Sequence, residues 1–164
     1  MRCHPGFHTF AGKTLALGAM LVVCVGVLSV QSSQSLAKPR INTLGLRGVA
    51  IKGYDPVAYF RKRAPVRGSK TYSLKHAGVE WRFSSAENKS AFAANPAKYM
   101  PAYGGYCAYG VSRGYLVKIE PNAWAIRGGK LYLNYDRSVQ RTWAKRPGHY
   151  IATANKKWPR LIGK

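Results

Sequence analysis

The feature that most constrains this chain is a predicted export signal at its N-terminus. Arg2 and Lys13 precede an uncharged apolar run over 15–30, and Ser35-Leu36-Ala37 then supplies the small residues of a cleavage site. This order is typical of a secretory signal peptide cleaved after Ala37. An uncleaved anchor is the alternative, which the basic residues just after the segment disfavour. We therefore expect a periplasmic or secreted protein with no transmembrane span after cleavage.

Cleavage would limit both the size and the cysteine content of the mature chain. Removing 37 of the 164 residues leaves 127, which is enough for one hydrophobic core. Cys3 and Cys24 leave with the signal, so Cys107 is the one cysteine of the mature chain. A disulfide within one molecule is therefore excluded. In an oxidising compartment such a thiol is buried and inert, joined to another molecule, or used in chemistry.

The mature chain is also very basic. The signal contains two of the 27 Lys and Arg residues and none of the 5 acidic ones, so cleavage lowers the net charge from +22 to +20. The basic residues are dispersed from Lys38 to Lys164, which argues against a nucleic-acid partner. Attraction to an anionic envelope surface is the expected consequence.

The same composition argues against an enzyme. Five acidic residues make catalysis by a pair of carboxylates improbable. The sequence also lacks a Ser-His-Asp set, a phosphate-binding loop and a Cys-x-x-Cys pair.

Alternating apolar and polar side chains predict two β-hairpins, at 72–83 and 124–133, each with a two-residue turn that contains glycine. A further strand is predicted at 115–119. No internal repeat is evident in the amino-acid sequence.

Capping residues predict the helices. Ser84 and Glu87 form a capping-box pattern that predicts a helix to about Ala94, and Asp136 is expected to cap another. A last helix would place three side chains on one face: Tyr150, Ala154 and Trp158. The expected architecture is α+β, a small antiparallel sheet of hairpins with one central helix and a C-terminal helical pair.

Several ordered motifs resemble the YHS domain family. They are Gly53-Tyr-Asp-Pro-Val-Ala-Tyr-Phe60, Trp81-Arg-Phe-Ser-Ser85 and Phe92-Ala-Ala-Asn-Pro-Ala-Lys-Tyr99. A later motif, Tyr103-Gly-Gly-Tyr-Cys-Ala-Tyr109, is similar to the exported bacterial branch of that family, some of whose members are labelled selenoproteins. The expected organisation is a signal peptide at 1–37, a polar leader at 38–47 and a YHS-like domain at 48–161.

The resemblance implies heavy-metal handling, often of copper. In the wider family the metal is associated with three cysteines, and the matching positions here are Ala58, Ser84 and Asn88. None of these side chains supplies a thiolate, so the ligand set of the family does not carry over.

Cys107 is the remaining candidate for chemistry. Gly104, Gly105 and Gly110 flank it and would let a ligand approach the backbone. The positive charge of the domain predicts a lowered thiol pKa if Cys107 is even partly exposed. For copper(I) or another soft metal, the expected ligands are Cys107 with Met100 and His76, with His149 a weaker candidate.

A pocket around this thiol would have aromatic walls. The candidate residues are Asp55, Tyr59, Tyr103, Tyr106 and Tyr109. Asp55 before a proline would ordinarily cap a turn, and the alternative is that it orients a group near Cys107. The tyrosines would bind a planar ligand or fill the core.

Three functions follow as hypotheses. The first is a binding or sensing module in heavy-metal homeostasis that uses Cys107 as a soft ligand. The second is a thiol-dependent redox protein in which Cys107 reacts and an unidentified protein partner resolves it. The third is a structural, envelope-associated domain whose cysteine is merely packed.

Overall fold

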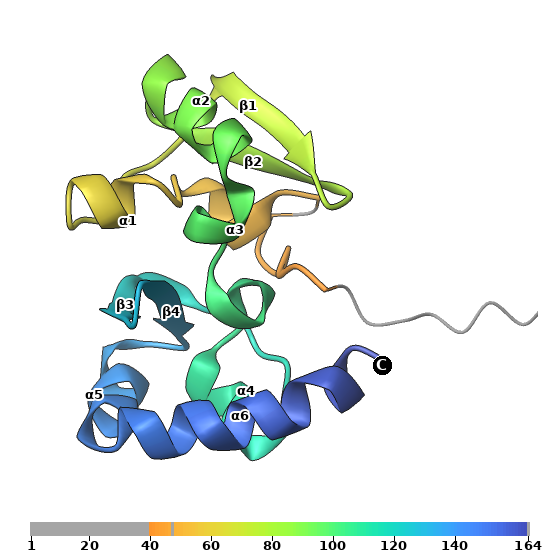
Figure 1. The fold of residues 1–164 in the computed structure, drawn as a ribbon, viewed down its shortest axis with the longest axis vertical. Helices are drawn as coiled ribbons and strands as arrows, with labels where there is room; N and C mark the ends of the chain where they lie inside the picture. Colours follow the sequence, from red (N-terminus) through yellow and green to blue (C-terminus); the bar gives the residue numbers. More distant parts are fainter. Residues whose placement is uncertain (1–39, 47, 164) are drawn as a thin grey trace, which may run out of the picture. The chain divides into compact units, whose positions relative to one another are not determined.

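The computed structural model describes residues 40–46 and 48–163. The predicted signal peptide at 1–37 lies outside these residues. The α+β class is confirmed, because helices alternate with two small antiparallel sheets (Figure 1). The helical elements are η1 (Ala50–Gly53), α1 (Ala58–Arg61), α2 (Ala86–Ala94), α3 (Pro96–Tyr99), η2 (Ala102–Gly105), α4 (Ala108–Arg113), α5 (Arg137–Lys145) and α6 (Pro147–Leu161). None of the helices in the described ranges is long and apolar enough to cross a membrane.

Both predicted hairpins form, each as a separate two-stranded sheet. Strand β1 (Ser69–His76) pairs with β2 (Val79–Phe83), and β3 (Glu120–Arg127) pairs with β4 (Lys130–Asn134). Both residues of each turn have positive φ, which is the conformation that suits the twist of a tight hairpin.

The strand predicted at 115–119 is wrong. This segment has no ladder partner, and β3 begins only at Glu120. Its backbone bonds run instead to the region of α4: the N–H of Tyr115 donates to the carbonyl oxygen of Gly110, and that of Cys107 donates to Val117. Among the described residues, no further strand joins the two hairpins into one sheet.

The helix caps are partly as predicted. Asp136 caps α5 by accepting a hydrogen bond from the N–H of Val139 at 2.7 Å. Ser85, and not Ser84, caps α2, because its side chain accepts from the N–H of Asn88. Ser84 is engaged elsewhere, by a buried carboxylate described below.

The fold contains an internal repeat that the sequence did not reveal. The elements β1, β2, α2 and α3 begin at 69, 79, 86 and 96, and β3, β4, α5 and α6 begin at 120, 130, 137 and 147, a constant offset of 51 residues. Each hairpin has its register shift at the matching place, between Ser69 and Ser73 and between Glu120 and Trp124. The chain is thus built from two copies of one hairpin–helix–helix unit.

The turn before each unit repeats as well. η1 and η2 have the sequences AIKG and AYGG, and both contain consecutive left-handed residues. The φ angles are 42° and 57° at Ile51 and Lys52, and 55° and 59° at Tyr103 and Gly104. A short helix follows each turn, α1 after η1 and α4 after η2. The turn therefore fixes the position of a residue that lies between it and the helix.

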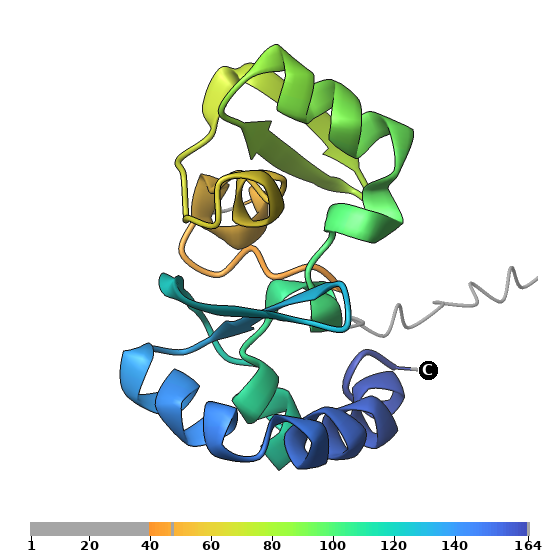
Figure 2. The ribbon, with the colours of Figure 1, turned by 60° about the vertical axis from the view of Figure 1, so that its left-hand side comes forward.

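The core has two clusters. One contains side chains from both repeats, including Trp81 and Phe92 from the first and Leu131 and Leu133 from the second. The other is formed largely by the second repeat and η2, with Trp143 fully buried. The predicted face of α6 packs into this second cluster, and α6 runs beside α4 in the view of Figure 2.

Part of the predicted polar leader joins the two turns. Asn42 is buried, and its backbone N–H donates to the carbonyl oxygen of Gly104 at 2.8 Å. Its side-chain amide donates to the carbonyl oxygen of Gly105 at 2.8 Å, and its own carbonyl oxygen accepts from the N–H of Ile51 at 3.2 Å. Residues 40–46 therefore hold η1 and η2 together.

This contact requires glycine at position 104. A Cβ atom there would lie 1.8 Å from the carbonyl oxygen of Arg40, and φ is +59°. We predict that Gly104→Ala lowers the free energy of unfolding by about 3 kcal/mol, because both the clash and the backbone strain must be relieved. Urea unfolding followed by tryptophan fluorescence measures this change. Gly148→Ala is the control, since nothing lies within 4 Å of its Cβ position. Equal stability of Gly104→Ala and the wild type would contradict the described contact.

Candidate thiol site

Cys107 lies between η2 and α4 in the chain and beside strand β4 in the fold. It forms an isolated parallel bridge with Leu133 of β4, and its side chain is 1% exposed. Its sulfur accepts hydrogen bonds from the backbone N–H groups of Gly110 at 3.3 Å and Tyr135 at 3.2 Å. The thiol in turn donates to the Oδ1 atom of Asn134 at 3.9 Å. The thiol is therefore surrounded by polar groups within an otherwise apolar core.

These surroundings set the protonation of the thiol. Burial raises the pKa of Cys107, while the N–H groups of Gly110, Tyr135 and Tyr109 act in the opposite direction. The lowered pKa expected from the basic composition required partial exposure, which Cys107 does not have. The net direction is upward, because removal from water outweighs the hydrogen bonds. The resting thiol is consequently protonated at neutral pH.

Asp55 is the counterpart of Cys107 in the first repeat. It is completely buried, and its Oδ1 accepts from the N–H groups of Val57 at 2.8 Å and Ala58 at 3.2 Å. Its Oδ2 accepts from the N–H of Ser84 at 2.8 Å, the hydroxyl of Ser84 at 2.7 Å and the Nδ2 of Asn88 at 2.6 Å. Five donors thus surround one carboxylate, which is the usual way to hold a buried anion.

The two backbone N–H groups that donate to the Cys107 sulfur each have a counterpart among the backbone donors to Asp55. Ala58 and Gly110 each lie three residues after the acceptor, and Ser84 and Tyr135 each follow the second strand of their hairpin. The sulfur of Cys107 therefore occupies the place that a carboxylate occupies in the first repeat. We call the backbone N–H groups of Gly110 and Tyr135, with the side chain of Asn134, the sulfur cradle.

The cradle differs from its counterpart in the side chains. With the offset of 51, the Asn88 position is occupied by Val139, and the Phe83 position is occupied by Asn134. Oδ1 of Asn134 accepts from the N–H of Tyr109 at 3.3 Å, whereas its Nδ2 is buried and has no hydrogen-bond partner within residues 40–46 and 48–163. The amide that lies against the sulfur therefore has an unused donor.

A cavity of about 290 Å³ borders the sulfur cradle. Its lining is formed by Cys107, Tyr109, Gly110, Arg113, Tyr115, Val117, Tyr135 and Val139. Tyr115 is 66% exposed and Tyr135 is also exposed, so aromatic side chains stand where the cavity meets solvent. A small molecule in this cavity would contact Cys107 without any part of the core having to unfold.

The other predicted pocket residues are distributed over the fold. Asp55 caps its own turn and accepts the five bonds described above, and Tyr59 is buried with its hydroxyl donating to the carbonyl oxygen of Pro121 at 3.0 Å. Burial raises the pKa of the Tyr59 phenol well above its usual value. Tyr109 lines the cavity beside Cys107, and Tyr106 packs in the second core cluster.

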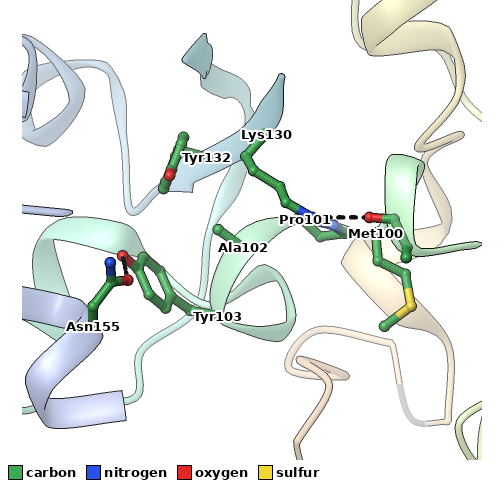
Figure 3. A pocket seen from close by; sticks show the side chains of 8 residues that line it. Met100, Pro101, Ala102, Tyr103, Lys130, Tyr132 and Asn155 are labelled. Atoms are coloured by element: carbon green, nitrogen blue, oxygen red, sulfur yellow. Dashed lines mark hydrogen bonds between the residues drawn. The ribbon is translucent and has the colours of Figure 1, made fainter. Parts of the chain in front are cut away.

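Met100 and Tyr103 line a different cavity, of about 500 Å³ (Figure 3). The Tyr103 hydroxyl donates to Oδ1 of Asn155 at 2.8 Å, and Lys130 donates to the carbonyl oxygen of Ala97 at 3.0 Å. Figure 3 shows the thioether of Met100 pointing away from Tyr103 and Asn155. Burial also raises the pKa of the Tyr103 phenol.

The predicted soft-metal ligands, including the weaker candidate His149, are found in four different settings. Cys107 and Met100 line separate cavities, and His76 stacks edge-on against Phe92 with ring centroids 5.7 Å apart. His149 likewise packs against Tyr150. In the part of the chain that the structure describes, no three His, Cys, Asp or Glu side chains gather into a metal-holding group. Copper binding stays a prediction.

Comparison of the chain with protein-family models, with curated proteins and with solved structures finds no match.

Asn134 is the site residue that sequence reasoning missed. The available signal was the shared pattern Ala-x-x-Gly-Tyr at 50–54 and 102–106, which is followed at once by Asp55 and Cys107. Aligning the chain on this pattern and on the two hairpins places Cys107 opposite a carboxylate and Asn134 opposite Phe83.

The raised pKa predicts the pH dependence of alkylation. Because the thiolate is the nucleophile, the rate at Cys107 should rise with pH and reach half its maximum above the ordinary thiol value of about 8.5. Mass spectrometry of the peptide containing Cys107, after timed exposure to iodoacetamide, measures this rate. The urea-unfolded protein provides the reference curve. A native rate that has already levelled off by about pH 8 would contradict the raised pKa.

Proposed function

We propose that this protein is an exported, YHS-like, thiol-dependent redox protein whose reactive group is Cys107. The observation that carries the proposal is the position of the sulfur, which accepts two backbone hydrogen bonds where the first repeat holds a carboxylate. Hydrogen bonds to an anion are stronger than those to a neutral acceptor. The cradle therefore favours any step in which negative charge develops on the sulfur.

Burial and the cradle have complementary effects on such a thiol. Burial keeps the thiol protonated at rest, which limits reactions with arbitrary electrophiles. The fixed N–H groups need no reorganisation when the proton leaves, so they lower the cost of forming the thiolate inside the core. The near-complete burial of Cys107, which is 1% exposed, limits access to small reagents.

Copper(I) handling is the rival proposal, and it follows from the YHS resemblance. It is supported by a soft sulfur donor that borders a cavity. Among the described residues, no cluster of three His, Cys, Asp or Glu side chains completes a site, so the remaining ligands would have to come from Met100 or from a partner protein. A structural role for the buried cysteine is the third alternative.

One experiment separates the redox proposal from the structural role. Purified protein is exposed to one equivalent of hydrogen peroxide, and oxidation of the Cys107 peptide is followed by mass spectrometry with and without later dithiothreitol. We expect reversible oxidation of native Cys107, with the Cys107→Ser protein as the control for oxidation elsewhere. If Cys107 does not react in the native protein but does react in the unfolded protein, the redox proposal is contradicted and the structural role remains.

The rival is tested with an anaerobic copper(I) competition titration on the same two proteins. The redox proposal predicts that both lose the metal to the chelator. One copper held by the wild type and not by Cys107→Ser would support metal handling instead.

A further inference from the structure

We infer that the sulfur cradle stabilises a cysteine sulfenate, Cys107–SO⁻, formed by reaction with a hydroperoxide, and that the amide of Asn134 donates to the added oxygen. This inference rests on the proposed redox function and names its oxidant class and product. It has three supports: an unused buried donor, the comparison with Asp55, and the lack of a second cysteine in the described residues.

The unused donor is the Nδ2 group of Asn134. This side chain is 0% exposed, and its Nδ2 has no partner among the described residues. A buried amide donor without a partner costs about 1–3 kcal/mol, so its presence calls for an explanation. The Oδ1 atom of the same amide lies 3.9 Å from the sulfur and accepts from the thiol. Oxidation removes that S–H donor, and on this inference the amide then turns its Nδ2 toward the oxygen added to the sulfur.

The first repeat shows what an oxyanion needs at this position. Beyond its backbone donors, the Asp55 carboxylate accepts two side-chain bonds, from Ser84 and Asn88. Around Cys107 the backbone donors are present, but the positions of Ser84 and Asn88 are occupied by Tyr135 and Val139. The unoxidised Cys107 side chain has no oxygen atom that could accept hydrogen bonds from such donors. Asn134 supplies one amide donor that becomes useful only when the sulfur has an oxygen.

The surroundings also favour persistence of this product. A sulfenic acid ordinarily condenses with a nearby thiol to form a disulfide. Cys107 is the one cysteine among the described residues, and it is 1% exposed. The cavity beside it is lined mainly by aromatic and aliphatic side chains, with Arg113 as the charged member. A second protein thiol would therefore not reach the oxidised sulfur readily.

The chemical step is a two-electron oxidation. The Cys107 thiolate attacks the terminal oxygen of the hydroperoxide, an S–O bond forms, and the O–O bond breaks. The departing alkoxide takes up a proton and leaves as an alcohol, or as water when the oxidant is hydrogen peroxide. The balance is RS⁻ + R′OOH → RSO⁻ + R′OH, in which the sulfur loses two electrons and the peroxide gains them.

The experiment follows the lifetime of the Cys107 peptide with one added oxygen in an excess of tert-butyl hydroperoxide, because the second oxidation to sulfinate consumes a second hydroperoxide. Asn134→Asp keeps an acceptor for Tyr109 and removes the donor, while Asn134→Leu places an aliphatic side chain where the first repeat has Phe83. Asn155→Asp is the matched control, because it makes the same change in the other cavity. Circular dichroism checks that each variant is folded.

We expect the singly oxidised state to last about tenfold longer in the wild type and in Asn155→Asp than in the folded Asn134 variants, which should proceed to sulfinate. Equal lifetimes in the wild type and the Asn134 variants, or immediate sulfinate in the wild type, would overturn this inference and leave the redox function intact. A wild-type Cys107 that gains no oxygen would overturn the redox function itself.

Discussion

The structure depends on a pair of backbone N–H groups that meet at one residue in each repeat. One donor is in the short helix that follows the left-handed turn, and the other follows the second strand of the hairpin. The first donor is buried in each repeat, and a buried backbone donor must be paired. The residue that accepts from both therefore joins the turn to the hairpin. Asp55 does this in the first repeat and Cys107 does it in the second.

The two acceptors give the same architecture different chemical consequences. Asp55 engages five donors, so its site is complete and serves the stability of the fold. Cys107 accepts from the backbone donors with a single sulfur atom, and the Nδ2 of Asn134 has no partner in the part of the chain that the structure describes. Buried polar groups that are only partly satisfied are costly, so each one calls for an explanation. The proposed chemistry is assigned to the second repeat for this reason.

The local elements were predictable from sequence because their signals are local. Ala77-Gly78 and Gly128-Gly129 identify the hairpin turns, and Asp136 identifies a helix start. The strand at 115–119 was not correct, because alternation alone does not supply a pairing partner. The capping residue of α2 was displaced by one position, since Ser84 is taken by Asp55, which is 29 residues away in the chain.

Cys107 was predictable as the candidate thiol, because it is the one cysteine of the expected mature chain. Asn134 was not predictable, because its role depends on its contact with Cys107, which is 27 positions away in the chain. The repeat was concealed because the residues that define each copy, such as Asp55 and Cys107, differ in chemical type.

The central claim is that the Cys107 position is a cradle for an anion, and its most direct test is to place a carboxylate there. The measurement is the urea unfolding free energy of Cys107→Asp and its uncharged isostere Cys107→Asn, at neutral and at acidic pH. If the backbone N–H groups stabilise an anion, Cys107→Asp will be at least as stable as Cys107→Asn at neutral pH. It will lose that advantage as the pH falls and the carboxylate is protonated, because hydrogen bonds to the anion lower the folded-state pKa. A Cys107→Asp protein that is unfolded or much less stable than Cys107→Asn at neutral pH, and recovers on acidification, would contradict the account.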